Sequence, residues 1–193
     1  MTTVMIEPEP AGAKVGFNTQ NIRVLFSEEQ IAECIAQLAS EIAATMPQEL
    51  VVISVLKGSF IFAADLIRAL HRSSLEPEID FLKLSSYGEN TESSGEMDIL
   101  FDLSANVAGR EVLVVDDILD TGRTLSFVRN LLNEREAATV KACCLLDKAE
   151  RRVVDVEAEY VGFACPNEFV VGYGLDYAHR YRELPYIGFV TDS

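Results

Sequence analysis

The sequence predicts an α/β domain in which a mainly parallel central sheet is flanked by helices on both faces. Short apolar runs, typical of buried strands, alternate with segments whose apolar residues have helical spacing, and this alternation is typical of parallel βαβ units. The chain has 193 residues, enough for one such domain and too few for two ordinary ones. With 49% hydrophobic and 24% charged residues its composition is globular, so we expect residues 1–193 to form a single domain.

The N-terminal part should hold an extension followed by a helix. Residues 1–18 contain prolines and acidic residues, and we expect them to form a loose extension. Ser27-Glu28-Glu29-Gln30 is a capping box, in which a serine and a glutamine three residues later satisfy free backbone groups at a helix start. The next apolar residues fall on one helical face, and they are Ile31, Cys34, Ile35, Leu38 and Ile42. Pro47 ends this helical region.

The following segments predict strand, turn, helix and strand in that order. Residues 51–55 are a β-branched run typical of a buried strand, and residues 56–59 form a turn. Residues 60–70 have helical spacing, and residues 79–84 are a second strand. Residues 85–95 are polar and contain two glycines, and a loop of this length in a compact chain is typical of a functional lid or of a disordered segment.

The C-terminal half predicts more strands than helices. We expect one helix over residues 121–134, and strands over residues 97–102, 111–115, 139–146, 160–164, 169–173 and 186–190. Because the last strands have no full helix between them, this part should be irregular.

Composition and charge exclude several classes of protein. No apolar run approaches the roughly 18 residues of a membrane-spanning helix, and the N-terminus lacks the basic and apolar regions of a signal peptide. A net charge of −15 argues against a nucleic-acid-binding surface. The four cysteines form no C-x-x-C pair, and His71 and His179 do not complete a zinc set with them. We therefore expect reduced core thiols in a cytoplasmic protein.

The strongest functional signal is the segment VLVVDDILDTGRTL, residues 112–125. An apolar run is followed by the adjacent carboxylates of Asp116 and Asp117, and after Asp120 a Thr-Gly-Arg-Thr turn opens a helix. Ligands of open α/β sheets bind outside the carboxyl ends of the strands, and a helix N-terminus offers free N–H groups to a phosphate. Carboxylates beside a phosphate repel it unless they face sugar hydroxyls or Mg²⁺, so the motif predicts a site for a phosphorylated sugar.

This motif resembles the phosphoribosyl-diphosphate-binding motif of the type I phosphoribosyltransferases. Four further stretches narrow the resemblance to the hypoxanthine-guanine phosphoribosyltransferases: LKGS at 56–59, SSYG at 85–88, LLDK at 145–148, and 169–177 together with 181–186. The resemblance extends over about residues 22–190. It implies the type I phosphoribosyltransferase fold, with a small irregular hood region, a flexible lid loop, and a homodimer or homotetramer.

The resemblance also implies a reaction in purine salvage. The 5-phosphoribosyl group of phosphoribosyl diphosphate would move to N9 of hypoxanthine or guanine, giving IMP or GMP and releasing diphosphate, with Mg²⁺ as cofactor. The resemblance assigns phosphoribosyl diphosphate to Lys57, Gly58, Asp116, Asp117, Asp120, Thr121, Gly122, Arg123, Thr124 and Arg182.

Within that set the implied roles differ. The 5′-phosphate would lie on the turn 120–124, and Asp116 and Asp117 would hold the ribose hydroxyls directly or through Mg²⁺. The family usually has Glu-Asp at this pair. Asp120 would be the general acid/base at purine N7. Lys57 and Gly58 match the diphosphate loop, in which the bond from Leu56 to Lys57 is often cis.

The remaining assignments concern the base and the lid. Lys148 would donate a hydrogen bond to the purine O6, Phe169 would stack on the ring, and Val170 would contact the base through its backbone. Asp176, at the same pocket, would hold a second Mg²⁺. Arg182 would meet the diphosphate during closure. Ser86 and Tyr87 would belong to the lid.

Two alternatives remain open on the sequence alone. One is a regulatory RNA-binding protein built on this fold, which needs a basic face that a chain of net charge −15 does not favour. The other is a related transferase for adenine or orotate. For single residues a structural role also competes: Asp120 as a helix cap, Lys148 as a solvated lysine, and Phe169 as a core aromatic.

Overall fold

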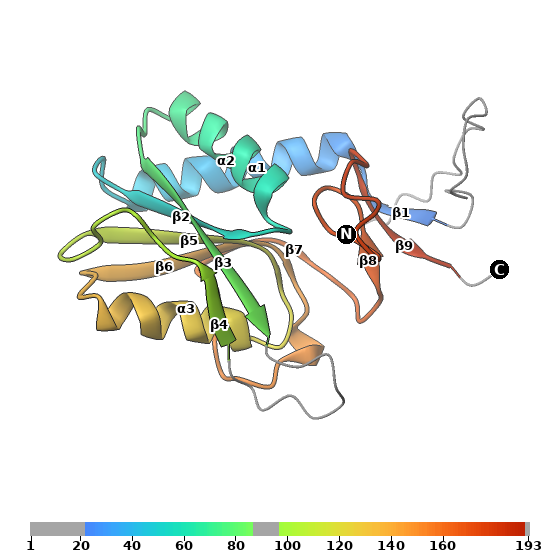
Figure 1. Ribbon diagram of the computed structural model, residues 1–193. Helices are drawn as coiled ribbons and strands as arrows, with labels where there is room; N and C mark the ends of the chain where they lie inside the picture. The colour runs from blue at the N-terminus through green and yellow to red at the C-terminus, as the bar shows by residue number, and fades with distance from the viewer. Residues whose placement is uncertain (1–21, 87–96, 192–193) are drawn as a thin grey trace.

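The computed structural model describes residues 22–86 and 97–191, and its ribbon is drawn in Figure 1. The expected N-terminal extension and the lid residue Tyr87 lie outside the described residues. The elements are β1 (Ile22–Phe26), α1 (Glu28–Thr45), β2 (Val51–Leu56), α2 (Phe60–Arg72), β3 (Glu78–Ser86), β4 (Met97–Phe101), β5 (Glu111–Leu119), α3 (Arg123–Glu134), β6 (Thr139–Asp147), the 3₁₀ turn η2 (Ala149–Arg151), β7 (Tyr160–Ala164), β8 (Val170–Val171) and β9 (Ile187–Val190).

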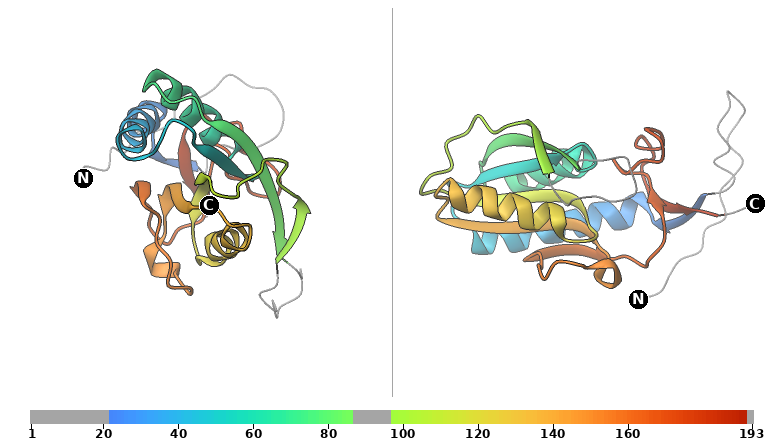
Figure 2. Two further views of the ribbon diagram at one scale, coloured as in Figure 1. Left: turned by 90° about the vertical axis from the view of Figure 1, so that its left-hand side faces the viewer. Right: turned by 60° about the horizontal axis from the view of Figure 1, so that its bottom comes forward.

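The larger sheet has the strand order β4-β3-β2-β5-β6-β7. Its strands pair in parallel except for β4, which pairs antiparallel with β3 at the edge. Helices α1 and α2 cover one face and α3 covers the other (Figures 1 and 2). The predicted α/β class with a mainly parallel sheet between helices is confirmed.

The core consists of two apolar layers, one on each face of this sheet. Along β2, Val52 packs toward α1 and α2, while Val51 and Ile53 pack toward α3. Residues buried on both faces explain why the strand is a continuous apolar run and not an alternating one. At the start of α1 both reciprocal bonds of the predicted capping box form between Ser27 and Gln30.

A second, antiparallel sheet of order β1-β9-β8 forms the hood, on the side of the molecule where β2 ends and where α1 and α2 begin (Figure 1). The expected small hood region is therefore present. Strand β1 was not predicted from the sequence, because its partner β9 comes from the opposite end of the chain.

Three predicted boundaries were wrong, for identifiable reasons. Strand β5 does not end before Asp116 but continues to Leu119, still paired with β6. Helix α3 begins at Arg123 and not at residue 121, because Gly122 precedes it in a left-handed conformation with φ of 85°. The strand expected at 169–173 shrinks to Val170–Val171, since residues 172–174 all have positive φ and leave the ladder.

The connection after β4 is anchored by one buried carboxylate, that of Asp80. Its oxygens accept the backbone N–H groups of Phe81 at 2.8 Å, Ser104 at 2.7 Å and Ala105 at 2.8 Å. Burial alone raises the pKa of Asp80, but the N–H groups of Ala105, Phe81 and Ser104 outweigh it and lower the pKa below its ordinary value. The ionised carboxylate therefore stabilises the fold.

Replacing Asp80 by alanine should lower the free energy of unfolding by about 2–3 kcal/mol at pH 7, because buried N–H groups lose a charged acceptor. A depressed pKa in the folded state means that this contribution is present above the unfolded pKa of about 4 and is lost as the pH falls through the folded value. The difference between wild type and variant should shrink accordingly in urea unfolding at acidic pH. Asp98→Ala, at an exposed position of β4, is the control and should change stability by less than about 0.5 kcal/mol. A difference that does not change with pH would contradict the assignment.

Candidate active site

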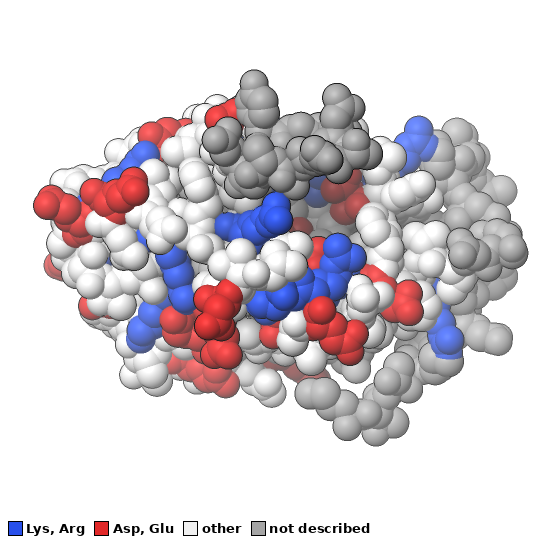
Figure 3. All heavy atoms as spheres, turned by 90° about the horizontal axis from the view of Figure 1, so that it is seen from below, with Lys and Arg blue, Asp and Glu red and all other residues white. Residues whose placement is uncertain are grey.

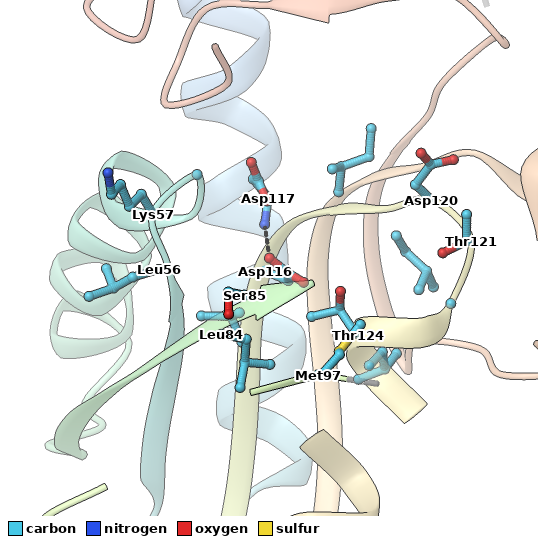
Figure 4. Close-up of a pocket in the computed structure, with 16 residues that line it drawn as sticks. Leu56, Lys57, Leu84, Ser85, Met97, Asp116, Asp117, Asp120, Thr121 and Thr124 are labelled. Atoms are coloured by element: carbon cyan, nitrogen blue, oxygen red, sulfur yellow. Dashed lines mark hydrogen bonds between the residues drawn. The ribbon is translucent and has the colours of Figure 1, made fainter. Parts of the chain in front are cut away.

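A cavity of about 340 Å³ opens at the carboxyl ends of β2, β3 and β5. Its lining includes Lys57 and Gly58 after β2, the pair Asp116 and Asp117, and the turn 120–124 before α3. Figure 4 shows Lys57 and that turn on opposite sides of the acidic pair. The structure thus brings together, in one cavity, eight of the ten residues assigned to phosphoribosyl diphosphate; Arg123 and Arg182 do not line it. The eight are Lys57, Gly58, Asp116, Asp117, Asp120, Thr121, Gly122 and Thr124.

The acidic pair lies at the centre of this cavity, with Asp116 buried and Asp117 half-buried. Asp116 Oδ1 accepts the N–H of Asp117 at 3.0 Å (dashed in Figure 4). Burial, followed by the charge of Asp117, raises the pKa of Asp116 well above its ordinary value. The pKa of Asp117 is also raised, again because of burial. Two carboxylates held out of water gain free energy from a cation or from hydroxyl donors, so the pair is suited to the predicted Mg²⁺ or ribose hydroxyls.

The turn after β2 packs directly on this pair. The peptide bond from Leu56 to Lys57 is cis, as the resemblance implied. A Cβ added to Gly58 would lie 1.7 Å from Asp117 Oδ2, so only glycine leaves room for the carboxylate. Ser59, the last residue of this turn, has its hydroxyl oxygen 2.8 Å from the hydroxyl oxygen of Ser54 in β2. Lys57 itself is exposed at the rim.

A second cavity of about 320 Å³ adjoins the first. Asp117, Ile118 and Asp120 line both cavities, so the two meet along the end of β5. The second cavity holds all four residues assigned to the purine, which are Lys148, Phe169, Val170 and Asp176. The structure therefore places the expected sugar-phosphate residues and the expected base residues side by side, with Asp120 between them.

Lys148 and Phe169 occupy this second cavity in different ways. Lys148 is buried, and its Nζ donates to the carbonyl of Glu168 at 2.6 Å. Its backbone N–H donates to Leu119 O at 3.0 Å, which ties the end of β6 to that of β5. A solvated lysine is thereby ruled out. Phe169 is 55% exposed and makes an edge contact with Tyr177, so it is not a core aromatic.

Asp120 is paired with a residue that sequence reasoning missed. Arg151 Nε, in η2, lies 2.8 Å from Asp120 Oδ1, and both side chains line the second cavity. The neighbouring Arg152 binds the main chain behind Asp120. The signal was the pair of arginines three and four residues after Lys148, but their contacts join the segment after β6 to the end of β5 and have no local pattern in the sequence.

Asp176 and Arg182 form an ion pair with each other at 2.7 Å. Asp176 also accepts the N–H of His179 at 2.8 Å. Within residues 22–86 and 97–191 no three His, Cys, Asp or Glu side chains are grouped to hold a metal ion. The three residues expected to hold Mg²⁺ therefore do not form one group. Asp116 and Asp117 are adjacent, whereas Asp176 is paired with Arg182. Ser86 is the last residue of β3 and the last described residue before the segment 87–96.

The distribution of surface charge bears on the alternative of an RNA-binding protein. Basic and acidic side chains are interspersed over the face seen in Figure 3, without a continuous basic area, which does not favour an RNA-binding surface.

All four cysteines are buried and free, as expected from the sequence. Burial raises the pKa of Cys34 to about 11, so its thiol is unreactive. No helix in the described part of the chain is long and apolar enough to cross a membrane.

Comparison with known proteins identifies the family. Residues 24–178 match the family described as "Phosphoribosyl transferase domain". The chain belongs to this family. It is 48% identical over 170 residues to the hypoxanthine-guanine phosphoribosyltransferase of Bacillus subtilis. The aligned residues cover 86% of this chain and 91% of the relative. A crystal structure of the hypoxanthine-guanine phosphoribosyltransferase of Bacillus anthracis has a TM-score of 0.82 and 48% identity, covering 87% of this chain and 98% of the other.

Other relatives are longer. The chain is 51% identical over 167 residues to the bifunctional protein TilS/HprT of Listeria monocytogenes, but it spans only 25% of the length of that protein. The resemblance to hypoxanthine-guanine phosphoribosyltransferases and the type I phosphoribosyltransferase fold expected from it are both confirmed.

The contact between Gly58 and Asp117 generates a prediction for this family's reaction. Gly58→Ala should lower kcat/KM for phosphoribosyl transfer by about 10²-fold, because the new methyl group displaces the Asp117 carboxylate. Gly109→Ala is the control, since a Cβ there meets nothing within 4 Å. Its positive φ of 70° should cost about 1 kcal/mol of stability and leave kcat/KM unchanged. Equal kinetics in the Gly58 variant and wild type would refute the role of this close approach.

Proposed function

We propose that this protein is a purine-salvage enzyme that transfers the 5-phosphoribosyl group of phosphoribosyl diphosphate to N9 of hypoxanthine or guanine. The observation that carries the proposal is the junction of the two cavities at Asp117 and Asp120. A phosphorylated sugar in the first cavity and a base in the second would meet there. The products would be IMP or GMP and diphosphate.

The proposed binding follows the chemistry of each cavity. The 5′-phosphate binds the turn 120–124, where backbone N–H groups at the start of α3 and the hydroxyls of Thr121 and Thr124 are donors. Arg123 supplies a positive charge at the same turn. The diphosphate binds at Lys57 and Gly58. Arg182 reaches it by leaving Asp176, its present partner.

Base recognition depends on Lys148. A buried ammonium bonded to a single carbonyl retains donors for an oxygen of the base, and a 6-oxopurine offers O6 where adenine offers an amino group. Phe169, exposed beside the cavity, supplies an aromatic face for stacking, and Val170 supplies backbone groups.

Asp120 is proposed as the general acid/base. As N9 forms its bond to C1′ and the bond from C1′ to the diphosphate oxygen breaks, the purine loses the proton on N7. Asp120 lies between sugar and base and accepts that proton. Because Arg151 already contacts Oδ1, the free oxygen Oδ2 is the one that faces N7.

Mg²⁺ fits the first cavity as part of the substrate complex. Asp116 and Asp117 provide adjacent, buried carboxylates, while Mg²⁺ commonly takes its other ligands from phosphate oxygens and water. When bound, Mg²⁺ neutralises charge on the diphosphate leaving group. A second Mg²⁺ at Asp176 requires that the ion pair with Arg182 opens.

The proposal extends to the protein's setting. Four free, buried cysteines support a reducing compartment, the cytoplasm. The aromatic and aliphatic side chains of Phe81, Leu100 and Phe101, exposed on neighbouring strands β3 and β4, support a homodimer or homotetramer.

Turnover with five bases tests the proposal directly. With phosphoribosyl diphosphate and Mg²⁺, hypoxanthine and guanine should be converted to nucleotides, while adenine, orotate and uracil should not. EDTA should abolish turnover and excess Mg²⁺ should restore it. Conversion of adenine or orotate at comparable rates would refute the proposed base specificity, and full activity in EDTA would refute the proposed need for Mg²⁺.

Lys148→Met tests the proposed recognition of the base. The variant should bind guanine about tenfold or more weakly than wild type, because a buried charged hydrogen bond is lost.

Asp120→Asn tests the proton transfer. The amide keeps the shape of the side chain but cannot accept the N7 proton, so kcat should fall by about 10²–10⁴-fold. Affinity for phosphoribosyl diphosphate should change much less, because the backbone N–H groups of the turn remain. A helix cap would instead lose at most about 1 kcal/mol of stability with kcat nearly unaltered. Measuring kcat and melting temperature on the same variant separates the two roles.

A further inference from the structure

We propose that Arg152 is the positioning residue of the phosphate-binding turn, and that it sets the affinity for the phosphate end of the substrate through the backbone. This inference rests on the proposed function, because it assumes that the turn 120–124 binds a phosphate. Arg152 lies outside the motif that forms the turn, 30 residues beyond Gly122, and it reaches the turn from the segment that follows β6 and η2.

The guanidinium of Arg152 holds two consecutive carbonyls at the end of β5. Its Nη1 donates to Leu119 O at 3.0 Å and to Asp120 O at 2.7 Å. Its Nη2 donates to the carboxylate of Asp147 at the end of β6. The side chain is only 16% exposed, so these are contacts of a packed group and not of a surface charge. Arginine suits this place because its planar fork binds several acceptors at once.

A third carbonyl is held from the same side. The N–H groups of Val153 and Val154 donate to Thr121 O at 3.0 and 3.1 Å. The carbonyls of three consecutive residues, 119 to 121, are therefore all bound by the segment 152–154. Gly122 packs against this segment too, since an added Cβ would lie 2.9 Å from Arg152 Cδ.

The orientation of these carbonyls determines the orientation of the next N–H groups. Within a planar trans peptide the C=O of one residue and the N–H of the following residue point in opposite directions. Carbonyls 119–121 turned toward Arg152 thus direct the N–H groups of Asp120, Thr121 and Gly122 away from it, and these three residues line the first cavity. Successive N–H groups directed to one side form an anion-binding concavity.

Arg152→Met tests this inference, because methionine keeps the apolar stem against Gly122 and removes every donor. Calorimetric titration with ribose 5-phosphate should show affinity about 10- to 100-fold below wild type, since the turn's donors lose their fixed orientation. The KM for phosphoribosyl diphosphate should rise in parallel, while the dissociation constant of guanine should change less than about threefold. Arg152→Lys, which retains one donor group, should recover part of the affinity.

Arg129→Met is the matched control. Arg129 also lies in an ion pair with a carboxylate of the segment between β6 and β7, that of Glu159, and its side chain is 23% exposed. It is on α3, away from the turn, so its loss should lower the melting temperature without changing affinity for ribose 5-phosphate. An equal loss of affinity in both variants would reduce Arg152 to a general stabilising role and overturn the inference.

Two further outcomes separate this inference from the proposed function. If wild type binds ribose 5-phosphate and Arg152→Met binds it equally well, the positioning role is wrong and the proposed function stands. If wild type itself does not bind ribose 5-phosphate, the turn is not a phosphate site, and both the proposed function and the inference drawn from it fail.

Discussion

Two adjacent carboxylates inside a buried strand are the constraint around which the site is organised. Strand β5 continues through Asp116 and Asp117 to Leu119 and stays in register with β6. Burial raises the pKa of both side chains, so the empty pair is electrostatically unfavourable. Its neighbours are arranged accordingly: glycine at position 58 leaves room for Asp117, and the positive charge of Arg182 partly offsets the rise in the pKa of Asp117.

The hood couples this strand end to the base cavity. Gly174, with φ of 100°, would place a Cβ 2.1 Å from Gly58 O, so the hood packs directly on the turn after β2. Arg182 donates to the carbonyl of Gly174 and pairs with Asp176. A movement at Arg182 therefore affects both the residues proposed to bind diphosphate and a residue that lines the base cavity. The two cavities share Asp117, Ile118 and Asp120, so they are two parts of one site and not independent pockets.

Local patterns predicted the parts of the molecule whose determinants are local. The capping box at Ser27 and the apolar run of β2 needed only neighbours in sequence, and the motif from 112 to 125 identified the strand end that lines both cavities. The pairing of β1 with β9 was not predicted, because it joins segments more than 160 residues apart. Arg151 and Arg152 were missed for the same reason: their contacts with residues 119 and 120 depend on the parallel pairing of β5 with β6.

To bind the proposed diphosphate substrate, a chain of net charge −15 needs short-range contacts more than a favourable overall field. At physiological ionic strength charges more than about 8 Å apart are largely screened in water, whereas hydrogen bonds within a cavity are not. Surface acids therefore weaken long-range attraction of the substrate but leave local binding by the turn and by Lys57 intact. Association with Mg²⁺ lowers the negative charge that approaches the protein, which relieves the same repulsion. The buried acidic pair and the acidic surface thus favour the same form of the proposed substrate, its magnesium complex.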